Sequence, residues 1–91
     1  MRWIEFKKRN FKTIPYTKEE KERIKKYLLG GEVTAIAPGF GEDINGNHIS
    51  IRIEKHSDGV FEWRNDMAYY VEQYNMALPE EFLAKILKET D

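Results

Sequence analysis

Apolar residues recur at helical spacing in residues 17–28, TKEEKERIKKYL. Thr17 and Glu20 have the spacing of a capping box, in which each side chain satisfies the other residue's backbone N–H. A Gly-Gly pair follows at residues 30–31, and glycine readily takes the left-handed conformation that ends a helix. The pattern therefore predicts a helix with one buried stripe. The stripe consists of Ile24, Tyr27 and Leu28.

Strict alternation of apolar and polar residues marks the middle of the chain as β-structure. Residues 48–55, HISIRIEK, place isoleucines on one face of a strand and polar residues on the other. The Asp58-Gly59 pair is a strong hairpin signal, so the chain should return through Phe61 and Trp63. We expect these two aromatics to share the covered face with the isoleucines. The isoleucines are Ile49, Ile51 and Ile53.

Two further segments have strand character. Residues 32–39, EVTAIAPG, read as a strand, and residues 2–7, RWIEFK, alternate in a way that suits a short N-terminal strand. The turn-rich residues 38–47 lie between the first of these strands and the isoleucine strand.

The last third of the chain predicts helices. Asn65 or Asp66 can cap a helix over residues 67–75, and Pro79 suits the first turn of a final helix. The whole pattern predicts one α+β domain, residues 1–91. Its small antiparallel sheet has three strands, or four if the N-terminal segment joins it, packed with about three helices in the order (β)-α-β-β-β-α-α. The apolar stripes are Met67, Tyr70, Val71 and Tyr74, then Phe82, Leu83, Ile86 and Leu87.

Composition narrows the class of protein. The chain has no cysteine, which excludes disulfides and thiolate metal sites. It has no apolar run long enough for a bilayer, and its N-terminus is charged where a signal peptide is apolar. We therefore expect a bacterial, cytoplasmic protein that does not bind membranes.

Charge is unevenly distributed, although the net charge is −1. Residues 1–31 hold ten basic and four acidic side chains, and residues 32–91 hold five basic and twelve acidic ones. Such polarity suggests two faces of opposite sign, which would steer partners. The alternative is that folding interleaves the two halves and cancels the field.

One loop resembles a calcium site in outline. Asp43, Asn45 and Asn47 occupy alternate positions, and Glu54 is at the twelfth position when Asp43 is counted as the first. Calcium loops need glycine at the sixth position, and His48 stands there instead. We therefore read the segment as a polar hairpin turn set by Asn45-Gly46.

No other pattern predicts an active site. Ser50 and Ser57 lie outside a nucleophile-elbow setting, and APGFGED lacks the Lys-Ser/Thr ending of a phosphate loop. His48 and His56 would be roughly 27 Å apart on one extended strand, too far to share a metal, and we expect both to be exposed. The sequence therefore predicts no enzymatic activity, no cofactor and no metal site.

The N-terminal segment FKKRNFK supports a nucleic-acid hypothesis, because it interleaves aromatic and basic residues. The alternative is a solvated basic segment with Phe6 and Phe11 packed into the core. No ribonucleoprotein or GXXG fingerprint accompanies the segment. The candidate phosphate-binding residues are Lys7, Lys8, Arg9 and Lys12.

Aromatic residues concentrate in residues 58–82, and most have core positions by periodicity. Tyr69 differs, since it points about 100° away from Tyr70 on a helix. Tyr69, with the hydroxyl ends of Tyr70 and Tyr74, is therefore a candidate for contact with a partner.

The segment DGVFEWRNDMAYYVEQYNMALPEEFLAKI resembles the C-terminal part of small bacterial proteins associated with toxin–immunity loci. The resemblance covers about a third of the chain, does not extend to the basic N-terminal half, and implies no particular activity. Its residues are Asp58, Gly59, Trp63, Ala68, Tyr69, Tyr70, Val71, Tyr74, Leu78, Pro79 and Phe82.

An immunity protein for a nuclease must cover a basic cleft, and carboxylates beside tyrosines suit that task. We therefore expect an inhibitor of the immunity type that binds a protein partner, and the alternative is a nucleic-acid-associated regulator. The expected partner-binding residues are Tyr69 as anchor with Glu62, Asp66, Glu72, Glu42 and Asp43. Glu54 and Asp58 are further acidic candidates.

Overall fold

The computed structural model describes residues 2–5, 7, 9–43 and 45–90, apart from the side chains at strand positions 40, 50 and 51. Within these residues the order of elements is β-α-β-β-β-α-α, which confirms the α+β class. The strands are β1 (Arg2–Trp3), β2 (Glu32–Glu42), β3 (His48–Ser57) and β4 (Phe61–Arg64). The helices are α1 (Lys18–Leu28), α2 (Met67–Tyr74) and α3 (Glu80–Glu89).

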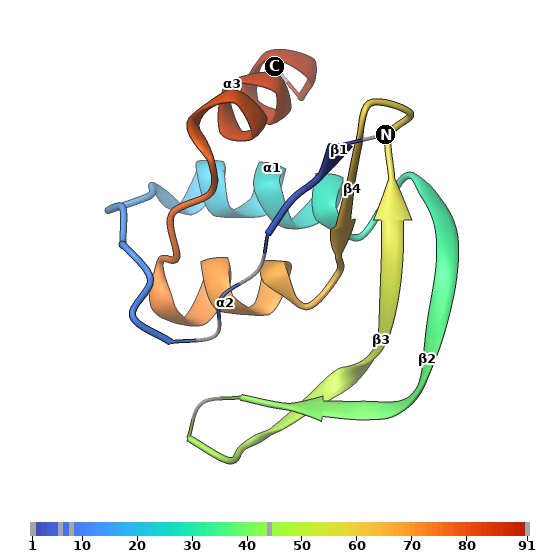
Figure 1. Ribbon diagram of the computed structural model, residues 1–91. Coiled ribbons are helices and arrows are strands. Elements are labelled where there is room, and N and C mark those ends of the chain that lie inside the picture. Colours follow the sequence, from blue (N-terminus) through green and yellow to red (C-terminus); the bar gives the residue numbers. More distant parts are fainter. Residues whose placement is uncertain (1, 6, 8, 44, 91) are drawn as a thin grey trace.

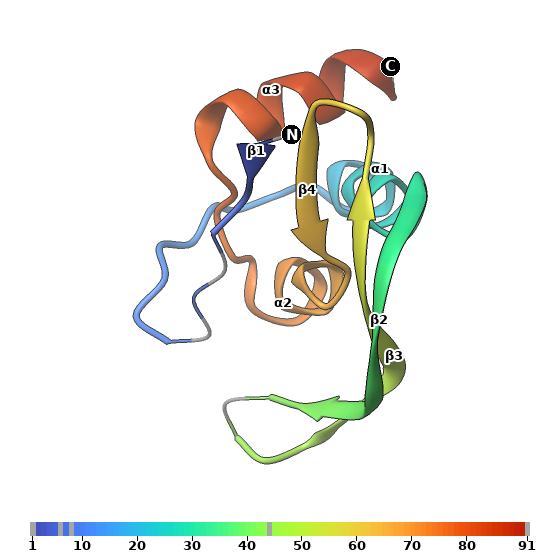
Figure 2. The same ribbon diagram turned by 45° about the vertical axis from the view of Figure 1, so that its right-hand side comes forward.

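The sheet has the order β1-β4-β3-β2 in the described part of the chain. β2, β3 and β4 are antiparallel neighbours, as expected, but the N-terminal β1 pairs parallel to β4, so the sheet is mixed. Figure 1 shows the helices stacked on one side of the sheet. Figures 1 and 2 both show the β2–β3 hairpin extending past β4 and curling below α2.

The capping box at the start of α1 is confirmed. The Thr17 hydroxyl accepts from Glu20 N–H at 3.1 Å, and the Glu20 carboxylate accepts from Thr17 N–H at 2.8 Å. After α1 the chain turns sharply through Gly31, whose φ is +77°. A side chain is excluded there, because a Cβ would lie 2.5 Å from the Ser57 carbonyl oxygen.

The start of α2 differs from the prediction. Asp66 occupies the cap position without a side-chain hydrogen bond to the helix. The Asn65 side chain instead bonds to β3, accepting from Glu54 N–H at 2.9 Å and donating to the Arg52 carbonyl at 2.7 Å. Asn65 thus ties α2 to the neighbouring strand rather than capping the helix.

The core lies between the sheet and the helices, and Trp63 is at its centre with no exposed surface. Its indole N–H donates to the Leu28 carbonyl at 2.9 Å, and its ring stacks on Tyr27 at 5.7 Å between centroids. Phe82 of α3 packs at 5.1 Å from the same ring. The apolar stripes of the helices therefore meet on one aromatic residue, as the periodicity predicts.

The expected pairing of Trp63 with the isoleucine face is wrong. Trp63 lies opposite His56, which is 4% exposed, and Lys55 lies opposite Arg64 on the other face. The reason is the length of the turn. Four residues separate the paired Ser57 and Glu62, and a turn with an even number of residues places the odd-numbered Trp63 opposite an even-numbered residue of β3. The isoleucines are odd-numbered, so they fall on the opposite face of β3 near β4.

The isoleucines themselves have different environments. Ile49 is buried, because the curled hairpin returns to the body of the molecule, whereas Ile53 is only partly buried. The side chain of Ile51 lies outside those that the structure describes.

Candidate functional site

The turn between β2 and β3 is organised by one carboxylate. Asp43 Oδ1 accepts from the backbone N–H of Asn45 at 2.8 Å and of Asn47 at 2.9 Å. Gly46 completes the turn with a φ of +80°, a conformation that favours glycine. The predicted polar hairpin turn is therefore present, and Asp43 is its hub.

Two tyrosines of α2 bind the other oxygen of this carboxylate. The hydroxyls of Tyr69 and Tyr74 donate to Asp43 Oδ2 at 2.7 and 2.8 Å. Asn45 Nδ2 donates in turn to the Tyr74 hydroxyl at 3.0 Å. We call Asp43, Asn45, Tyr69 and Tyr74 the tyrosine clasp, since these residues fasten the hairpin tip to α2.

The electrostatics of the clasp fix its protonation. The Tyr69 hydrogen bond, aided by Tyr74 and the turn amides, holds the pKa of Asp43 well below its usual value. The same bond to Asp43 raises the pKa of Tyr69 to about 12, and the Tyr74 pKa is also raised, chiefly by Asp43. Near neutral pH the clasp therefore holds a carboxylate and two protonated phenols, an arrangement suited to holding shape rather than transferring protons.

The rings of the clasp are held in place by their neighbours. Tyr69 and Tyr74 meet edge to face at 6.2 Å between centroids, and Tyr69 meets the buried Tyr70 at 5.5 Å. Phe11 from the N-terminal segment packs against Tyr70 at 6.1 Å. Tyr69 and Tyr74 are both partly buried.

Only part of the predicted acidic partner site comes together here. Asp43 and Tyr69 are in direct contact, and the exposed Glu42 precedes Asp43 in the chain. Asp43 itself is 6% exposed, so it holds the clasp from beneath the surface.

The other acidic candidates lie elsewhere. Asp66 has no exposed surface and binds Arg64 at 2.8 Å, so its prediction as a contact residue is wrong. Glu62 extends from β4 on the face opposite Trp63 and accepts from Thr34 at 2.7 Å. Glu72 forms an ion pair with Lys25 of α1 at 2.8 Å. These residues are spread over different faces because strand alternation and helix rotation separate them.

The Glu72–Lys25 pair, like the pair between Arg2 and Glu81, joins a basic residue of the first third to an acidic residue of the rest. Folding therefore interleaves the two charge groups in part.

The basic candidates remain at the surface. Lys7, Arg9 and Lys12 are exposed, and Lys8 lies outside the described residues. Phe11 is partly buried against the core, as the alternative reading of this segment expects, whereas Phe6 is outside the described residues.

The histidines differ from each other. His48 is exposed, as expected, but His56 is buried, which corrects the expectation for that residue. Its Nδ1 lies 2.6 Å from the Gly30 carbonyl oxygen and its Nε2 lies 3.0 Å from Glu54 Oε1. Both neighbours are acceptors, so the ring donates both hydrogen bonds when it carries both protons. His56 thus joins β3 to the end of α1.

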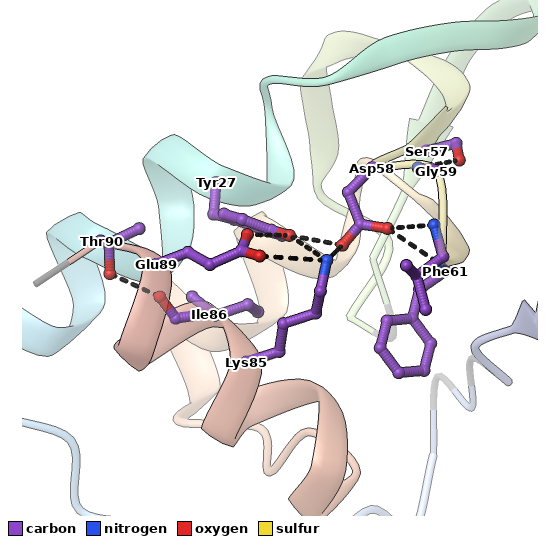
Figure 3. Close-up of polar contacts among 10 residues, drawn as sticks. Tyr27, Ser57, Asp58, Gly59, Phe61, Lys85, Ile86, Glu89 and Thr90 are labelled. Carbon is purple, nitrogen blue, oxygen red and sulfur yellow. Dashed lines mark hydrogen bonds and ion pairs between the residues drawn. The ribbon is translucent and has the colours of Figure 1, made fainter.

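A second polar cluster was not predicted from the sequence, although Asp58 was among the acidic candidates. Figure 3 shows Lys85 of α3 reaching Asp58 at the β3–β4 turn, 2.7 Å away. The Tyr27 hydroxyl donates to Asp58 as well, and Lys85 also contacts Glu89 at 3.3 Å. We call Tyr27, Asp58, Lys85 and Glu89 the Asp58 cluster.

The Asp58 cluster is held together by opposite charge. Burial opposes ionisation of Asp58, but hydrogen bonds from Lys85, Phe61 N–H and Tyr27 outweigh burial and keep its pKa well below 3.8. Burial, followed by the bond to Asp58, raises the pKa of Tyr27. The Asp58 bond also raises the pKa of Lys85. The residues come from three parts of the chain that are far apart in sequence, so no local motif predicts the cluster.

An open hollow of about 620 Å³ borders the Asp58 cluster. Its wall includes Arg23, Lys26, Tyr27 and Trp63. Arg23 bridges α1 to the end of α3, where its Nε donates to Thr90 Oγ1 at 3.0 Å. The polar groups that line the hollow thus also join elements of the fold.

Within the described residues, no group of three or more histidine, aspartate or glutamate side chains is arranged to hold a metal ion. In the same part of the chain, none of the helices has the length and apolar character needed to cross a membrane.

Comparison with known proteins gives no match to this chain among family models, curated proteins or solved structures. The resemblance of the C-terminal third therefore stays a prediction, and the tyrosine clasp is the main structural evidence that bears on function.

Proposed function

We propose that this chain is a non-enzymatic protein-binding domain of the immunity type, which neutralises a toxin by covering the toxin's basic active site. The observation that carries the proposal is the tyrosine clasp. It fixes the hairpin turn and two partly buried tyrosines of α2 in one arrangement, bound to the charged Asp43.

Rigidity is useful to a binding surface. Binding to side chains that are already held in place costs little additional conformational entropy, which favours affinity. Tyrosine combines a large apolar ring with a polar end, and it is enriched among residues that dominate binding energy. The neighbouring exposed hairpin residues extend the surface around the clasp: Glu42, Asn45, Gly46, Asn47 and His48.

Charge supports a basic partner. Glu42 is exposed at the clasp, and Asp43 keeps its negative charge directly below the tyrosine hydroxyls. Negative potential of this kind accelerates association with a positively charged cleft. The proposed interface is thus smaller than the sequence predicted, since Glu62, Asp66 and Glu72 lie outside it.

A genetic experiment tests the proposed role. Each reading frame that flanks this gene is expressed alone and together with this chain, and growth and complex formation are measured. We expect one flanking product to be toxic alone, and to be harmless and co-purified when this chain is present. The proposal fails if no flanking product is toxic or if this chain relieves no toxicity.

Two pairs of variants test the interface. Tyr69→Ala should weaken binding to that partner by about 2 kcal/mol or more, whereas Tyr69→Phe keeps the ring, loses only the bond to Asp43 and should weaken binding less. Glu42→Ala should slow association at low salt, whereas Glu80→Ala, at the exposed start of α3, should not. Circular dichroism checks the fold of each variant. A folded Tyr69→Ala variant with unchanged affinity excludes the clasp as the interface.

A second function, nucleic-acid binding, is favoured by one observation. Lys7, Arg9 and Lys12 are exposed, and among the described residues no carboxylate lies within ion-pair distance of them. Unpaired cations on one segment are available to phosphates.

Salt dependence tests this function. Affinity for single-stranded DNA or RNA should fall steeply with salt, and replacing these three residues by alanine should flatten the slope by up to about three units. The matched control replaces the exposed Lys18, Lys26 and Lys88 instead. Absence of binding at low salt removes this function.

A further inference from the structure

The strand β2 is the free edge of the sheet and is exposed along most of its length. Residues 32–39 are all exposed, and in the described part of the chain β2 pairs only with β3 in the sheet. Two large apolar side chains on it, Val33 and Ile36, are 44% and 58% exposed. An edge strand offers unpaired N–H and C=O groups to another strand, and natural proteins often protect such edges with lysine. No lysine lies on β2.

A bulge at Thr34 changes which side chains of β2 share a face. Val33 lies opposite His56, and Ile36 lies opposite Glu54. These partners are two residues apart on β3, so Val33 and Ile36 point to the same side, which is the side of Trp63 and the helices. Thr34 and Ala35 face the other side, where Thr34 bonds to Glu62 and Ala35 lies opposite Lys55.

The faces along β2 consequently read the same in both directions. Residues 32, 34, 35 and 37 face the outer side of the sheet, and residues 33 and 36 face the helix side. The pairing register with β3 fixes the face of residues 32, 33, 35 and 36. In an antiparallel pair, residues directly opposite each other share a face. A copy of β2 that runs antiparallel therefore matches every position, with Val33 opposite Ile36 and Thr34 opposite Ala35. Because the bulge interrupts the regular alternation, the axis between Thr34 and Ala35 is the one about which a copy of β2 matches the faces at all six positions.

We infer that β2 pairs with β2 of a second copy of this chain across a two-fold axis between Thr34 and Ala35. The pairing joins the two sheets edge to edge and brings each Val33 against the partner copy's Ile36. This inference does not rest on the proposed function, because the clasp lies at the other end of the hairpin.

Charge and chain geometry agree with this arrangement. The charged Glu32 lies opposite the neutral Ala37, and residues 33–41 carry no charged side chain. A parallel arrangement in register would instead place the two copies' Glu32 side chains together, which is unfavourable. Beyond the paired segment, Gly31 with its positive φ stands opposite Pro38, which has no N–H to donate. The paired segment, residues 32–37, is therefore bounded at both ends by the same pair of residues, Gly31 of one copy and Pro38 of the other.

Cross-linking tests the register. Because the native chain has no cysteine, the introduced thiols are the only ones that can react. The variants Val33→Cys and Ile36→Cys are prepared separately, mixed, and treated with an oxidant or a short bis-maleimide. We expect the mixture to give several-fold more covalent dimer than either variant alone. In each single variant, the two thiols would be roughly 10 Å apart along the strands. A mixture of Val60→Cys and Ile36→Cys is the control. Equal yields in all samples overturn the register.

Self-association is measured by sedimentation velocity over a wide range of protein concentration. Ile36→Lys should weaken dimerisation by at least about tenfold, because an ammonium group would be buried against Val33 without a partner. Val60→Lys makes the same change at a residue that is 53% exposed in the β3–β4 turn, and it should leave dimerisation unchanged. A chain that is monomeric at every concentration overturns the inference, as does an Ile36→Lys variant that associates like Val60→Lys.

Discussion

Tyr69 shows how far sequence reasoning reaches at the scale of single residues. Helical rotation separates it from the buried stripe of α2, and the structure agrees that it is only partly buried. Its contact with Asp43, 26 residues earlier, was not predicted as such. That contact depends on how far the bulged hairpin curls, which is a property of the tertiary fold and leaves no local pattern.

The Tyr69–Asp43 bond predicts an alkaline titration. The folded pKa of Tyr69 is raised to about 12 from 10.0, so its stabilising effect is complete below pH 10 and is lost as pH rises through about 12. We expect Asp43→Asn to return the pKa of Tyr69 toward 10.0, measured by NMR on ¹³C-labelled tyrosine. Asp58→Asn, on a different cluster, should leave Tyr69 unchanged. A Tyr69 that titrates near 10.0 in the unsubstituted protein contradicts the clasp.

The two tryptophans predict opposite responses to truncation. Trp63 has no exposed surface, so Trp63→Ala should lower the free energy of unfolding by about 3–5 kcal/mol. Trp3 is 42% exposed and lies under Lys55, with 5.2 Å between the ammonium and the ring centroid, so Trp3→Ala should cost about 1 kcal/mol or less. Chemical denaturation followed by circular dichroism measures both. Similar costs for the two variants would show that Trp63 is not the centre of the core.

At the scale of elements, α1 was predicted most completely. Its start, stripe and end each have a local signal, and the structure contains the capping box, the buried Ile24 and Leu28, and the turn after it. The strands were predicted less well, since their existence is local but their register is not. The even length of the β3–β4 turn places Trp63 on the His56 face and not on the isoleucine face, although each observed strand overlaps its predicted segment.

The capping box predicts a modest and specific effect on stability. Thr17→Ala removes the hydroxyl that accepts from Glu20 N–H and should lower the free energy of unfolding by about 1 kcal/mol. Thr17→Ser keeps a hydroxyl at the same place and should stay close to the unsubstituted protein. A denaturation midpoint for Thr17→Ala equal to that of Thr17→Ser would show that the cap is not stabilising.

For the whole molecule, polar clusters add further junctions between elements that also meet in the apolar core. The clasp fastens the hairpin to α2, and the Asp58 cluster joins the β3–β4 turn to α1 and α3. The pattern of apolar and polar positions predicted the class of fold and most of the core, because both follow from local sequence. The clusters could not be predicted in the same way, since each draws on elements brought together only by the complete topology.

The Asp58 cluster also predicts how the whole molecule responds to acid. The folded pKa of Asp58 is lowered, so its contribution is present above the ordinary value of 3.8 and is lost as pH falls below it. Loss of that charge weakens the bond to Lys85 and the junction of α3 with the sheet. We expect the free energy of unfolding to fall between about pH 5 and pH 2.

Asp58→Asn isolates this effect. The asparagine keeps an oxygen for the turn amides but has no charge to lose, so stability should be lower at neutral pH and should fall less steeply in acid, by on the order of 2 kcal/mol. Glu80→Gln removes an exposed carboxylate at the start of α3 and is the matched control. Urea denaturation at several pH values measures all three proteins. An Asp58→Asn variant whose stability falls as steeply as that of the unsubstituted protein would place the acid sensitivity elsewhere, with Asp43 of the clasp as the next carboxylate to test.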